Sequence, residues 1–372
     1  MTPTLPGSND ARRYARIRRR LLLIDLATSW MLLALAQAGG FSHAIAGWVR
    51  HQASDELLII AGYLAVFGAL IYAIMLPLHF YSSFIVEHRF HLSRMTLNDW
   101  GIREAKLLAV SAVLGLILIE SLYALLRAAP RTWPLWATVG WVGFSVVLAR
   151  IFPTILLPIF YKTAPVEEHA LVKRLLALCE RVKLPALGVY RFNLGAETRK
   201  ANAALAGLGG TRRVLLSDTL ISDFTPEEIE GVLAHELAHH HYRHITKHLA
   251  VGAAGSWIAF TLTRAMAGRW VAAWHLRNLA DIAGFPMLAL WLSLLGLIGL
   301  PLQNGLSRYF EWQSDRFAVR MTGDTNAFAN ALRRLAALNL ADPDPPQWAV
   351  WMFYDHPPIT ERIQAAERAK EP

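Results

Sequence analysis

The chain has 372 residues, of which 54% are hydrophobic and 17% are charged. This composition indicates a membrane protein, and because no nucleic-acid-binding motif accompanies the formal charge of +9, we expect no nucleic-acid partner. The single cysteine, Cys179, excludes an intramolecular disulfide, and we expect it to be buried in a helix as a small apolar residue.

Six apolar stretches are long enough to cross a membrane as helices, which takes about 17 to 25 residues each. Their approximate cores are residues 21–38, 57–78, 107–126, 133–149, 249–266 and 285–302. The sequence therefore predicts a mainly α-helical, polytopic membrane bundle with about six spans.

The distribution of Lys and Arg predicts how these spans are oriented. Basic residues crowd segments 12–20 and 89–106, whereas the loops after the first and third spans carry little more than Arg50 and Arg131. Because loops rich in Lys and Arg stay in the cytoplasm, we expect a cytoplasmic N-terminus. An even four spans then return the chain to the cytoplasm near Tyr161.

The first apolar run has an alternative interpretation. Its basic leader and the stretch Ala34-Leu35-Ala36 resemble a cleavable signal peptide, whose removal would leave five spans and reverse the orientation. We favour a retained first span, because Asp25 interrupts the apolar run and the basic leader is long for such a signal.

The polar segments complete the domain organisation. We divide the chain into a four-span membrane region (1–160), a polar segment with a small sheet (161–248), two further spans (249–304) and a C-terminal polar segment (305–372). Strand-like runs at 187–192, 201–206 and 213–217 predict the sheet. A helix is predicted to begin at Thr225, which suits the N-cap, with Pro226 in the first turn and Glu228 completing a capping box.

The strongest chemical signal lies on this helix, in VLAHELAHHHYRH, residues 232–244. His235 and His239 are four residues apart, so their rings leave one helical face and can bind one Zn²⁺. Glu236 is placed to reach a water on that metal. In such an H-E-x-x-H motif the zinc polarises a scissile carbonyl and acidifies the water, while the glutamate carries the proton to the leaving amine.

A catalytic zinc needs a third protein ligand, for which Glu311 in SRYFEWQSDRFAVR is our candidate. Asp315 lies one turn further along the predicted helix, where it could accept the free N–H of a ligand histidine. The alternative is an ordinary solvated helix with Glu311 paired to Arg308 and Asp315 paired to Arg320. The H-E-x-x-H motif favours the metal site.

Other polar residues are less suited to the metal. His240, His244 and His248 also recur every four residues, but their helical face has no acid placed like Glu236, so we expect a polar face beside the membrane. Glu120 and Asp25 lie inside predicted spans without an identifiable partner, and we leave both outside the site.

Several segments together resemble the CaaX prenyl protease 1 family of integral membrane zinc metalloproteases of the gluzincin type, and indicate a bacterial-type member. The matching stretches are LPLHFYSSFIVEHRFHLSRMTL, LLPIFYKTAPVEE, KANAALAGLGGTRRVLLSDTLI, VLAHELAHHHYRHI, LSRYFEWQSDRFA and YDHPPITERIQA. They follow the family's order and cover roughly residues 76–365.

The resemblance implies a zinc bound by His235, His239 and Glu311, with Glu236 as the general base. It also implies that two residues of YDHPPITERI, His356 and Arg362, point into the site and stabilise the oxyanion of the tetrahedral intermediate.

The resemblance further implies how substrate binds. Asn202 and Ala203 match the family's Asn-Ala on a sheet edge beside the zinc, where an extended substrate adds as a further strand. The family's spans enclose a large chamber with the zinc at its cytoplasmic end, the side on which our orientation also places the metal.

We therefore expect a membrane-embedded zinc metalloendopeptidase with one Zn²⁺ per chain, a lipid bilayer around it and a peptide or protein substrate. A prenylated C-terminal tail is the substrate that the resemblance implies. The chain lacks one N-terminal span of seven-span members and the aromatic residues after Asn202-Ala203, so a broad membrane-protein quality-control protease is the alternative. A metal transporter or sensor is more remote, because the spans offer few metal ligands.

Overall fold

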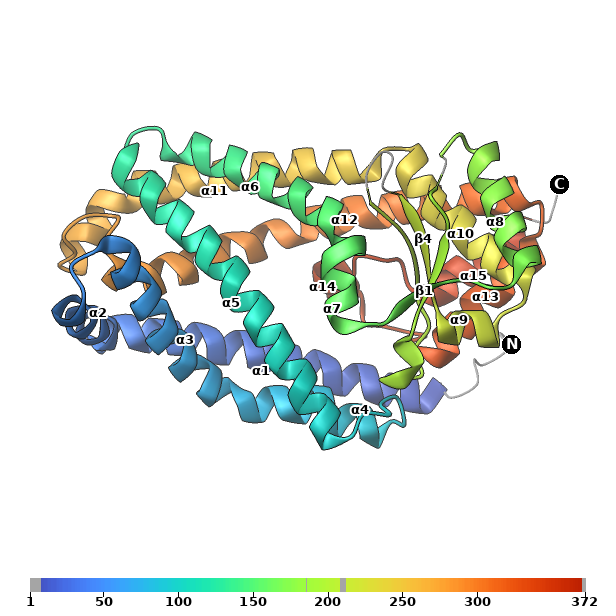
Figure 1. Ribbon diagram of the computed structural model, residues 1–372, viewed down its shortest axis with the longest axis horizontal. Coiled ribbons are helices and arrows are strands. Elements are labelled where there is room, and N and C mark those ends of the chain that lie inside the picture. Colours follow the sequence, from blue (N-terminus) through green and yellow to red (C-terminus); the bar gives the residue numbers. More distant parts are fainter. Residues whose placement is uncertain (1–7, 185, 208–211, 370–372) are drawn as a thin grey trace.

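The computed structural model describes residues 8–184, 186–207 and 212–369 (Figure 1). Six of its helical segments are long and apolar enough to cross a membrane, and the six expected spans are therefore confirmed. These segments are Asn9–Ala38, Glu56–Arg89, Leu97–Ala128, Trp133–Phe160, His244–Ala273 and Ile282–Thr322.

The first four spans lie in the N-terminal part of the chain. Its helices are α1 (Ser8–Ala38), α2 (Phe41–Gln52), α3 (Glu56–Phe80), α4 (Val86–Arg89), α5 (Leu97–Ala128), α6 (Trp133–Ile151) and α7 (Leu157–Phe160). Two π-helical turns, Tyr81–Ile85 and Phe152–Leu156, continue α3 into α4 and α6 into α7. The second of these turns contains Pro153, which lacks the N–H that a regular α-helical turn needs.

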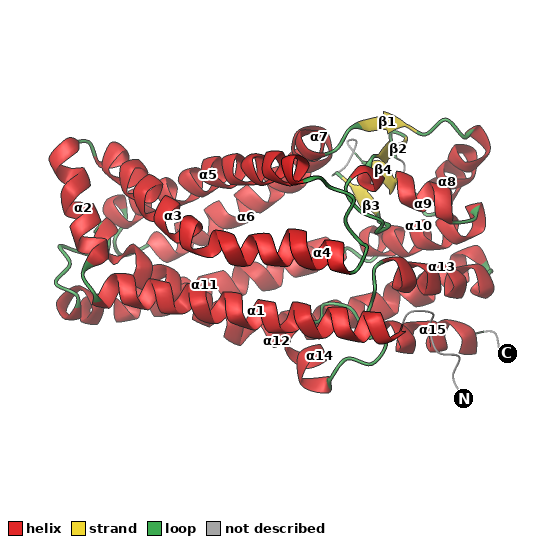
Figure 2. Ribbon diagram, turned by 90° about the horizontal axis from the view of Figure 1, so that it is seen from below, coloured by secondary structure: helices red, strands yellow, loops and turns green. Residues whose placement is uncertain are grey.

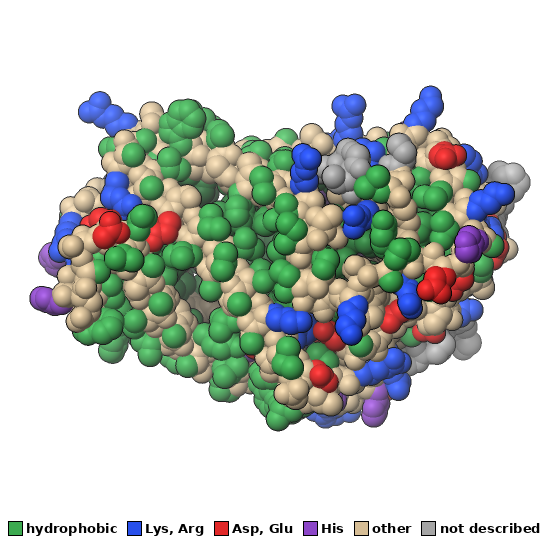
Figure 3. All heavy atoms as spheres, in the orientation of Figure 1, with side chains coloured by type: hydrophobic (Ala, Val, Ile, Leu, Met, Phe, Trp, Pro, Cys, Tyr) green, Lys and Arg blue, Asp and Glu red, His purple; other side chains and the backbone are tan. Residues whose placement is uncertain are grey.

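The surfaces of the spans are suited to lipid. In the most apolar window of each span no more than 22% of the residues are buried within the protein, and large side chains such as Ile298 and Leu302 are exposed. Figure 3 shows hydrophobic side chains over the middle of the half that holds the spans, whereas charged side chains gather over the end with the sheet and, in smaller number, at the opposite tip. Apolar area this extensive needs a hydrocarbon environment, which a bilayer supplies.

The charged end is built around a small sheet, seen in yellow in Figure 2. Its strands are β1 (Thr163–Pro165), β2 (Val189–Phe192), β3 (Ala203–Ala206) and β4 (Arg213–Ser217), in the order β1-β2-β4-β3. The pairs β1–β2 and β4–β3 are antiparallel and β2–β4 is parallel, which leaves β3 at one edge.

Shorter helices that follow β1, β4 and the sixth span complete the polar segments. They are α8 (His169–Arg181), α9 (Asp218–Asp223), α10 (Pro226–His241), α13 (Thr325–Leu338), α14 (Gln347–Phe353) and α15 (Ile359–Arg368). The fifth and sixth spans belong to α11 (His244–Ala273) and α12 (Phe285–Thr322), and α12 continues from the membrane region into this polar part. Its Phe317 and Ala318 share a buried core with Leu233 and Leu237 of α10.

The strand predictions were right in kind and differ at the boundaries. The second and third predicted runs appear as β3 and β4, and β2 begins two residues later than predicted, at Val189. The first strand, β1, was not predicted, because it is only three residues long and ends in Pro165. It is stabilised as an edge strand by its pairing with β2 rather than by its own sequence.

The histidine-rich stretch does not form one continuous helix, so the predicted common face of His240, His244 and His248 is wrong. Helix α10 begins at the predicted capping box, with Thr225 and Glu228 each binding the other's backbone. It then ends at His241, and Arg243 adopts the left-handed conformation with φ 55° before α11 starts at His244. This break turns His244 back towards the metal ligands.

Candidate active site

The three predicted metal ligands meet at the contact between α10 and α12. His235 Nε2 lies 3.2 Å from His239 Nε2, and these two atoms lie 3.3 and 3.2 Å from the two carboxylate oxygens of Glu311. All three ligand atoms lie within 4.8 Å of one another. Oε2 of Glu311 is buried and accepts no hydrogen bond from any described residue. A buried carboxylate that faces two imidazoles, and has one oxygen without a hydrogen bond, fits a metal ion.

Asp315 holds the first histidine. Its Oδ1 lies 2.8 Å from His235 Nδ1, so this nitrogen carries the proton and Nε2 is left free for a metal. Asp315 is held in turn by Arg362, whose Nε and Nη2 donate to its two oxygens at 2.8 and 2.7 Å. The structure thus places Asp315 as the sequence predicted, whereas the alternative pairing to Arg320 does not form: Arg320 donates to Tyr242.

A second set of contacts, which the sequence did not predict, holds the other histidine. His244 Nε2 donates to Gln313 Oε1 at 3.0 Å, which makes its Nδ1 an acceptor. This Nδ1 lies 3.1 Å from His239 Nδ1, so His239 donates from Nδ1 and also keeps Nε2 free for a metal. The only sequence signal for this arrangement was that His244 lies close to the motif. Gln313 is uncharged, and Arg243 is not a residue type that usually marks a left-handed turn.

The electrostatics of the site favour an added positive charge. Burial disfavours the charged form of His235, but Asp315 and Glu311 outweigh this effect and raise its pKa to about 10. Burial raises the pKa of Glu236, only partly offset by the neighbouring histidines. A proton or a metal cation at the ligand nitrogens would therefore be stabilised by the surrounding carboxylates.

His356 and Arg362 both reach this centre from the C-terminal segment. His356 Nε2 lies 3.4 Å from Glu311 Oε2, and its Nδ1 lies 2.9 Å from Asp355, which together with Glu311 raises the pKa of His356 against the effect of burial. Arg362 is buried and uses Nε and Nη2 on Asp315, while its Nη1 lies 3.4 Å from Glu311 Oε2. His356 is therefore the more accessible donor of the two.

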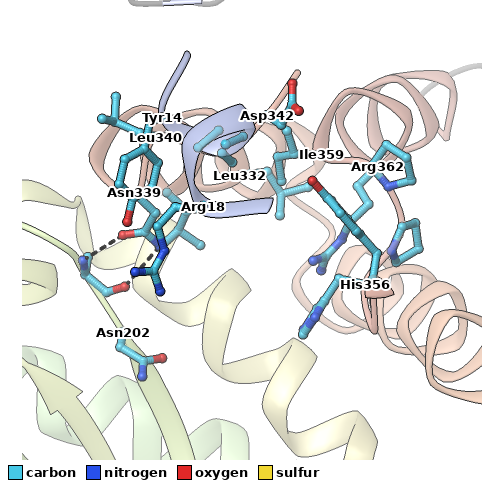
Figure 4. Close-up of a pocket in the computed structure, with 18 of the residues that line it drawn as sticks. Tyr14, Arg18, Asn202, Leu332, Asn339, Leu340, Asp342, His356, Ile359 and Arg362 are labelled. Atoms are coloured by element: carbon cyan, nitrogen blue, oxygen red, sulfur yellow. Dashed lines mark hydrogen bonds between the residues drawn. The ribbon is translucent and has the colours of Figure 1, made fainter. Parts of the chain in front are cut away.

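Asn202 and Ala203 lie across a cavity of about 650 Å³ from His356 and Arg362. Figure 4 shows Asn202 on the sheet side and the two C-terminal residues on the opposite side. Glu236 and His235 line the same cavity, whereas Glu120 and Asp25 do not. The cavity is thus lined by the predicted catalytic and substrate-binding residues and by one metal ligand, His235, while His239, Glu311 and Asp315 lie behind it at the contact between α10 and α12.

The edge strand β3 presents one open backbone position to this cavity. Asn202 O accepts from Ser217 N on β4, so alternation in an antiparallel pair directs the backbone of Ala203 away from β4, to the free edge. On the same edge, Leu205 O already accepts from His240 Nε2 at 2.9 Å. Ala203 is the position beside Glu236 that can pair with an added strand.

Two family models match the chain. Residues 165–370 match peptidase family M48, and residues 8–162 match a model described as CAAX prenyl protease N-terminal, five membrane helices. The chain belongs to peptidase family M48. Within the second match, four segments are long enough to be spans in the described structure, and the shorter α2 lies between the first two.

Curated relatives and a solved structure agree with this family. An uncharacterized metalloprotease, YhfN of Bacillus subtilis, is 26% identical over 96% of this chain and 85% of its own length. CAAX prenyl protease 1 of Saccharomyces cerevisiae is 25% identical over 83% of this chain and 72% of its own. The crystal structure of S. mikatae Ste24p shares the fold, with a TM-score of 0.83 and 22% identity, over 97% of this chain and 88% of that one. The protein is thus a multi-pass membrane metalloprotease of the CAAX prenyl protease type.

Proposed function

We propose that this metalloprotease uses one zinc ion, held by His235, His239 and Glu311, to hydrolyse peptide bonds of substrates bound along β3. The observation that carries this proposal is the convergence of the three ligand atoms, the orphaned Glu311 oxygen and the carboxylate of Glu236 beside one cavity. Two imidazoles and one carboxylate with an adjacent glutamate favour zinc over other divalent ions. Bound there, the zinc would act as a Lewis acid towards the peptide carbonyl and the attacking water.

Glu236 is the proposed general base. Its carboxylate takes a proton from the water that attacks the peptide carbonyl and then gives that proton to the departing amine nitrogen, so the C–N bond breaks as an N–H bond forms. Burial raises the pKa of Glu236, which makes the carboxylate a stronger base towards the attacking water.

His356 and Arg362 are the proposed oxyanion donors. His356 Nε2 is accessible from the cavity and close to Glu311, so it can donate to negative charge that develops on the carbonyl oxygen. Arg362 has only Nη1 left for this purpose, because its other donors hold Asp315. We therefore expect Arg362 to act mainly by positioning Asp315 and, through it, His235.

The substrate is proposed to bind as an extended strand whose backbone pairs with Ala203. Such pairing holds any peptide regardless of its side chains, while pockets beside the strand select among sequences. Apolar residues line much of the cavity and suit an apolar side chain or a prenyl group; they include Leu22, Phe328, Leu332, Leu335 and Ile359. The names of the yeast and other relatives favour prenylated tails, and a broad quality-control substrate range is the alternative that the test below separates.

We infer that the site faces the cytoplasm. The basic segments around residues 12–20 and 89–106 lie at the same end of the membrane helices as the polar unit, which agrees with the excess of Lys and Arg on cytoplasmic sides. Labelling of a cysteine introduced at exposed Asp344 in oriented membrane vesicles checks this, and labelling only from the opposite side would overturn it.

The decisive experiment compares the wild type with Glu236→Gln on two detergent-solubilised peptides, one farnesylated at a CaaX terminus and one unmodified. We expect the wild type to cut the peptides and the variant to be slower by about 10² to 10⁴-fold, which is the usual contribution of a general base. Both proteins should bind the same amount of zinc. The ratio between the two peptides decides between tail processing and broad cleavage. Equal activity of the two proteins would exclude Glu236 as the base, and zinc binding without cleavage of any peptide would remove the hydrolytic proposal.

A further inference from the structure

The substrate cavity continues past Asn202 into a second cavity of about 540 Å³, and Arg18 lies where the two meet. Arg18 projects from the first turns of α1, and Arg18, Ala201, Asn202 and Asn339 line both cavities. Figure 4 shows Arg18 on the side of Asn202 and Asn339, away from His356 and Arg362. A helix of the membrane region thus supplies one wall of the site.

Arg18 differs from the other basic residues around these cavities because it has no acidic partner among the described residues. The others are paired as Arg19 with Asp342 at 2.6 Å, Lys200 with Glu87 at 2.9 Å, Arg103 with Glu197 at 3.2 Å and Arg362 with Asp315 at 2.7 Å. Nη1 of Arg18 donates to Ser82 O at 3.2 Å. Its remaining N–H groups, from five donors in all, are available to an anion in the cavity.

The free edge of β3 ends beside this arginine. Two residues before the open Ala203, the backbone of Ala201 is already paired with the side-chain amide of Asn339: Ala201 N donates to Oδ1 at 3.2 Å, and Nδ2 donates to Ala201 O at 3.5 Å. Asn339 therefore occupies the place of one residue of a neighbouring strand. A bound chain can pair at Ala203, but its next pairing position, about 7 Å further on, is taken.

We propose that Arg18 binds the free C-terminal carboxylate of the substrate and that Asn339 marks the point where the bound chain stops. The inference rests on the proposed function, since it places the substrate on the Ala203 edge. The positive charge of Arg18 favours one direction of the bound chain. A positively charged amino terminus would be repelled by Arg18, whereas a carboxyl terminus would neutralise its charge. The bond cleaved beside Glu236 would then lie only a few residues from the free carboxyl end, as the processing of a C-terminal tail requires.

The test uses one peptide in two forms, with a free C-terminal acid and with a C-terminal amide, each with three residues after the cleaved bond. The proteins compared are the wild type, Arg18→Gln and Arg20→Gln. Arg20 is a matched control, because it is an exposed arginine on the same helix that lines neither cavity. Zinc content and thermal unfolding are measured for each protein, so that a misfolded variant is recognised.

We expect wild type and Arg20→Gln to prefer the acid by at least about tenfold in kcat/KM, as a charge-assisted pair predicts. In Arg18→Gln the preference should fall to about one, through a higher KM for the acid, while the amide is cut as by wild type. A third peptide, with a free acid but six further residues before it, should be cut like the amide by all three proteins.

The outcomes separate this inference from the proposed function. If wild type cuts the acid and the amide equally, or if Arg18→Gln keeps the full preference for the acid, Arg18 does not bind the carboxylate, although the protein is still a peptidase. If wild type cuts neither form, the proposed function fails and the carboxylate site fails with it.

Discussion

The two sides of the metal site hold their histidines by different chemistry. On the side of α12 and α15, His235 is buried against Asp315, which is itself paired with Arg362. On the side of α11, His239 is more exposed and is held by the neutral chain of His244 and Gln313. Both arrangements leave Nε2 free for the metal, yet only the first contains buried charges that depend on one another. Two histidine ligands with the same geometry can therefore be held by contacts whose loss destabilises the protein to very different degrees.

The charged side should be the more sensitive to mutation. Asp315→Asn removes the acceptor of His235 and leaves the buried Arg362 without its carboxylate, so we expect metal affinity to fall by about 10 to 100-fold and the free energy of unfolding to fall by about 3 to 5 kcal/mol. Metal titration and denaturant unfolding measure the two effects. Asp344→Asn, a change at an exposed aspartate, is the control and should alter neither.

The neutral side should tolerate a comparable change better. His244→Ala removes the acceptor of His239 Nδ1 without leaving a buried charge, so we expect a loss of about tenfold in metal affinity. Because His244 is itself buried and stacked on Phe310, the free energy of unfolding should also fall, but by less than for Asp315→Asn. His248→Ala, one turn further along α11 and without a hydrogen bond to either ligand, serves as the matched control. A loss as large as that of Asp315→Asn would show that the two sides are equivalent.

The pKa of the general base, Glu236, should determine how kcat/KM depends on pH. Burial raises the pKa of Glu236, and the base works only when it is deprotonated. We therefore expect kcat/KM to rise with pH, with an apparent pKa above the ordinary glutamate pKa of about 4.3. The profile is measured at constant zinc occupancy. An apparent pKa at or below the ordinary value would contradict the effect of burial on this carboxylate.

Much of the fold and the site could be predicted from local patterns. The spans follow from apolar runs, α10 from the capping box at Thr225, and the ligand pair from its four-residue spacing. Glu311 and Asp315, being one turn apart, were also recognisable on one helical face. These features depend on residues close in sequence, which is why the amino-acid order alone predicts them.

The missed features depend on long-range contacts or on an unusual backbone. Arg243 adopts a left-handed conformation that glycine or asparagine usually signals, so the break that redirects His244 has no sequence cue. In the sequence, Arg18 was one of the basic residues that indicate the orientation of the spans. Only the packing of α1 across the cavity distinguishes it from Arg16 or Arg20. The pairing of Asn339 with Ala201 joins positions 138 residues apart.

The length of α12 makes the bilayer itself a parameter of catalysis. One helix runs from Phe285 to Thr322 and carries both the sixth span and Glu311, which lies about 39 Å from the start of the helix at 1.5 Å per residue. A lipid bilayer that is thinner or thicker than the span changes the tilt of the helix. That tilt moves Glu311 relative to α10, so peptidase activity in vesicles should depend on acyl-chain length and be highest where the hydrophobic thickness matches the span.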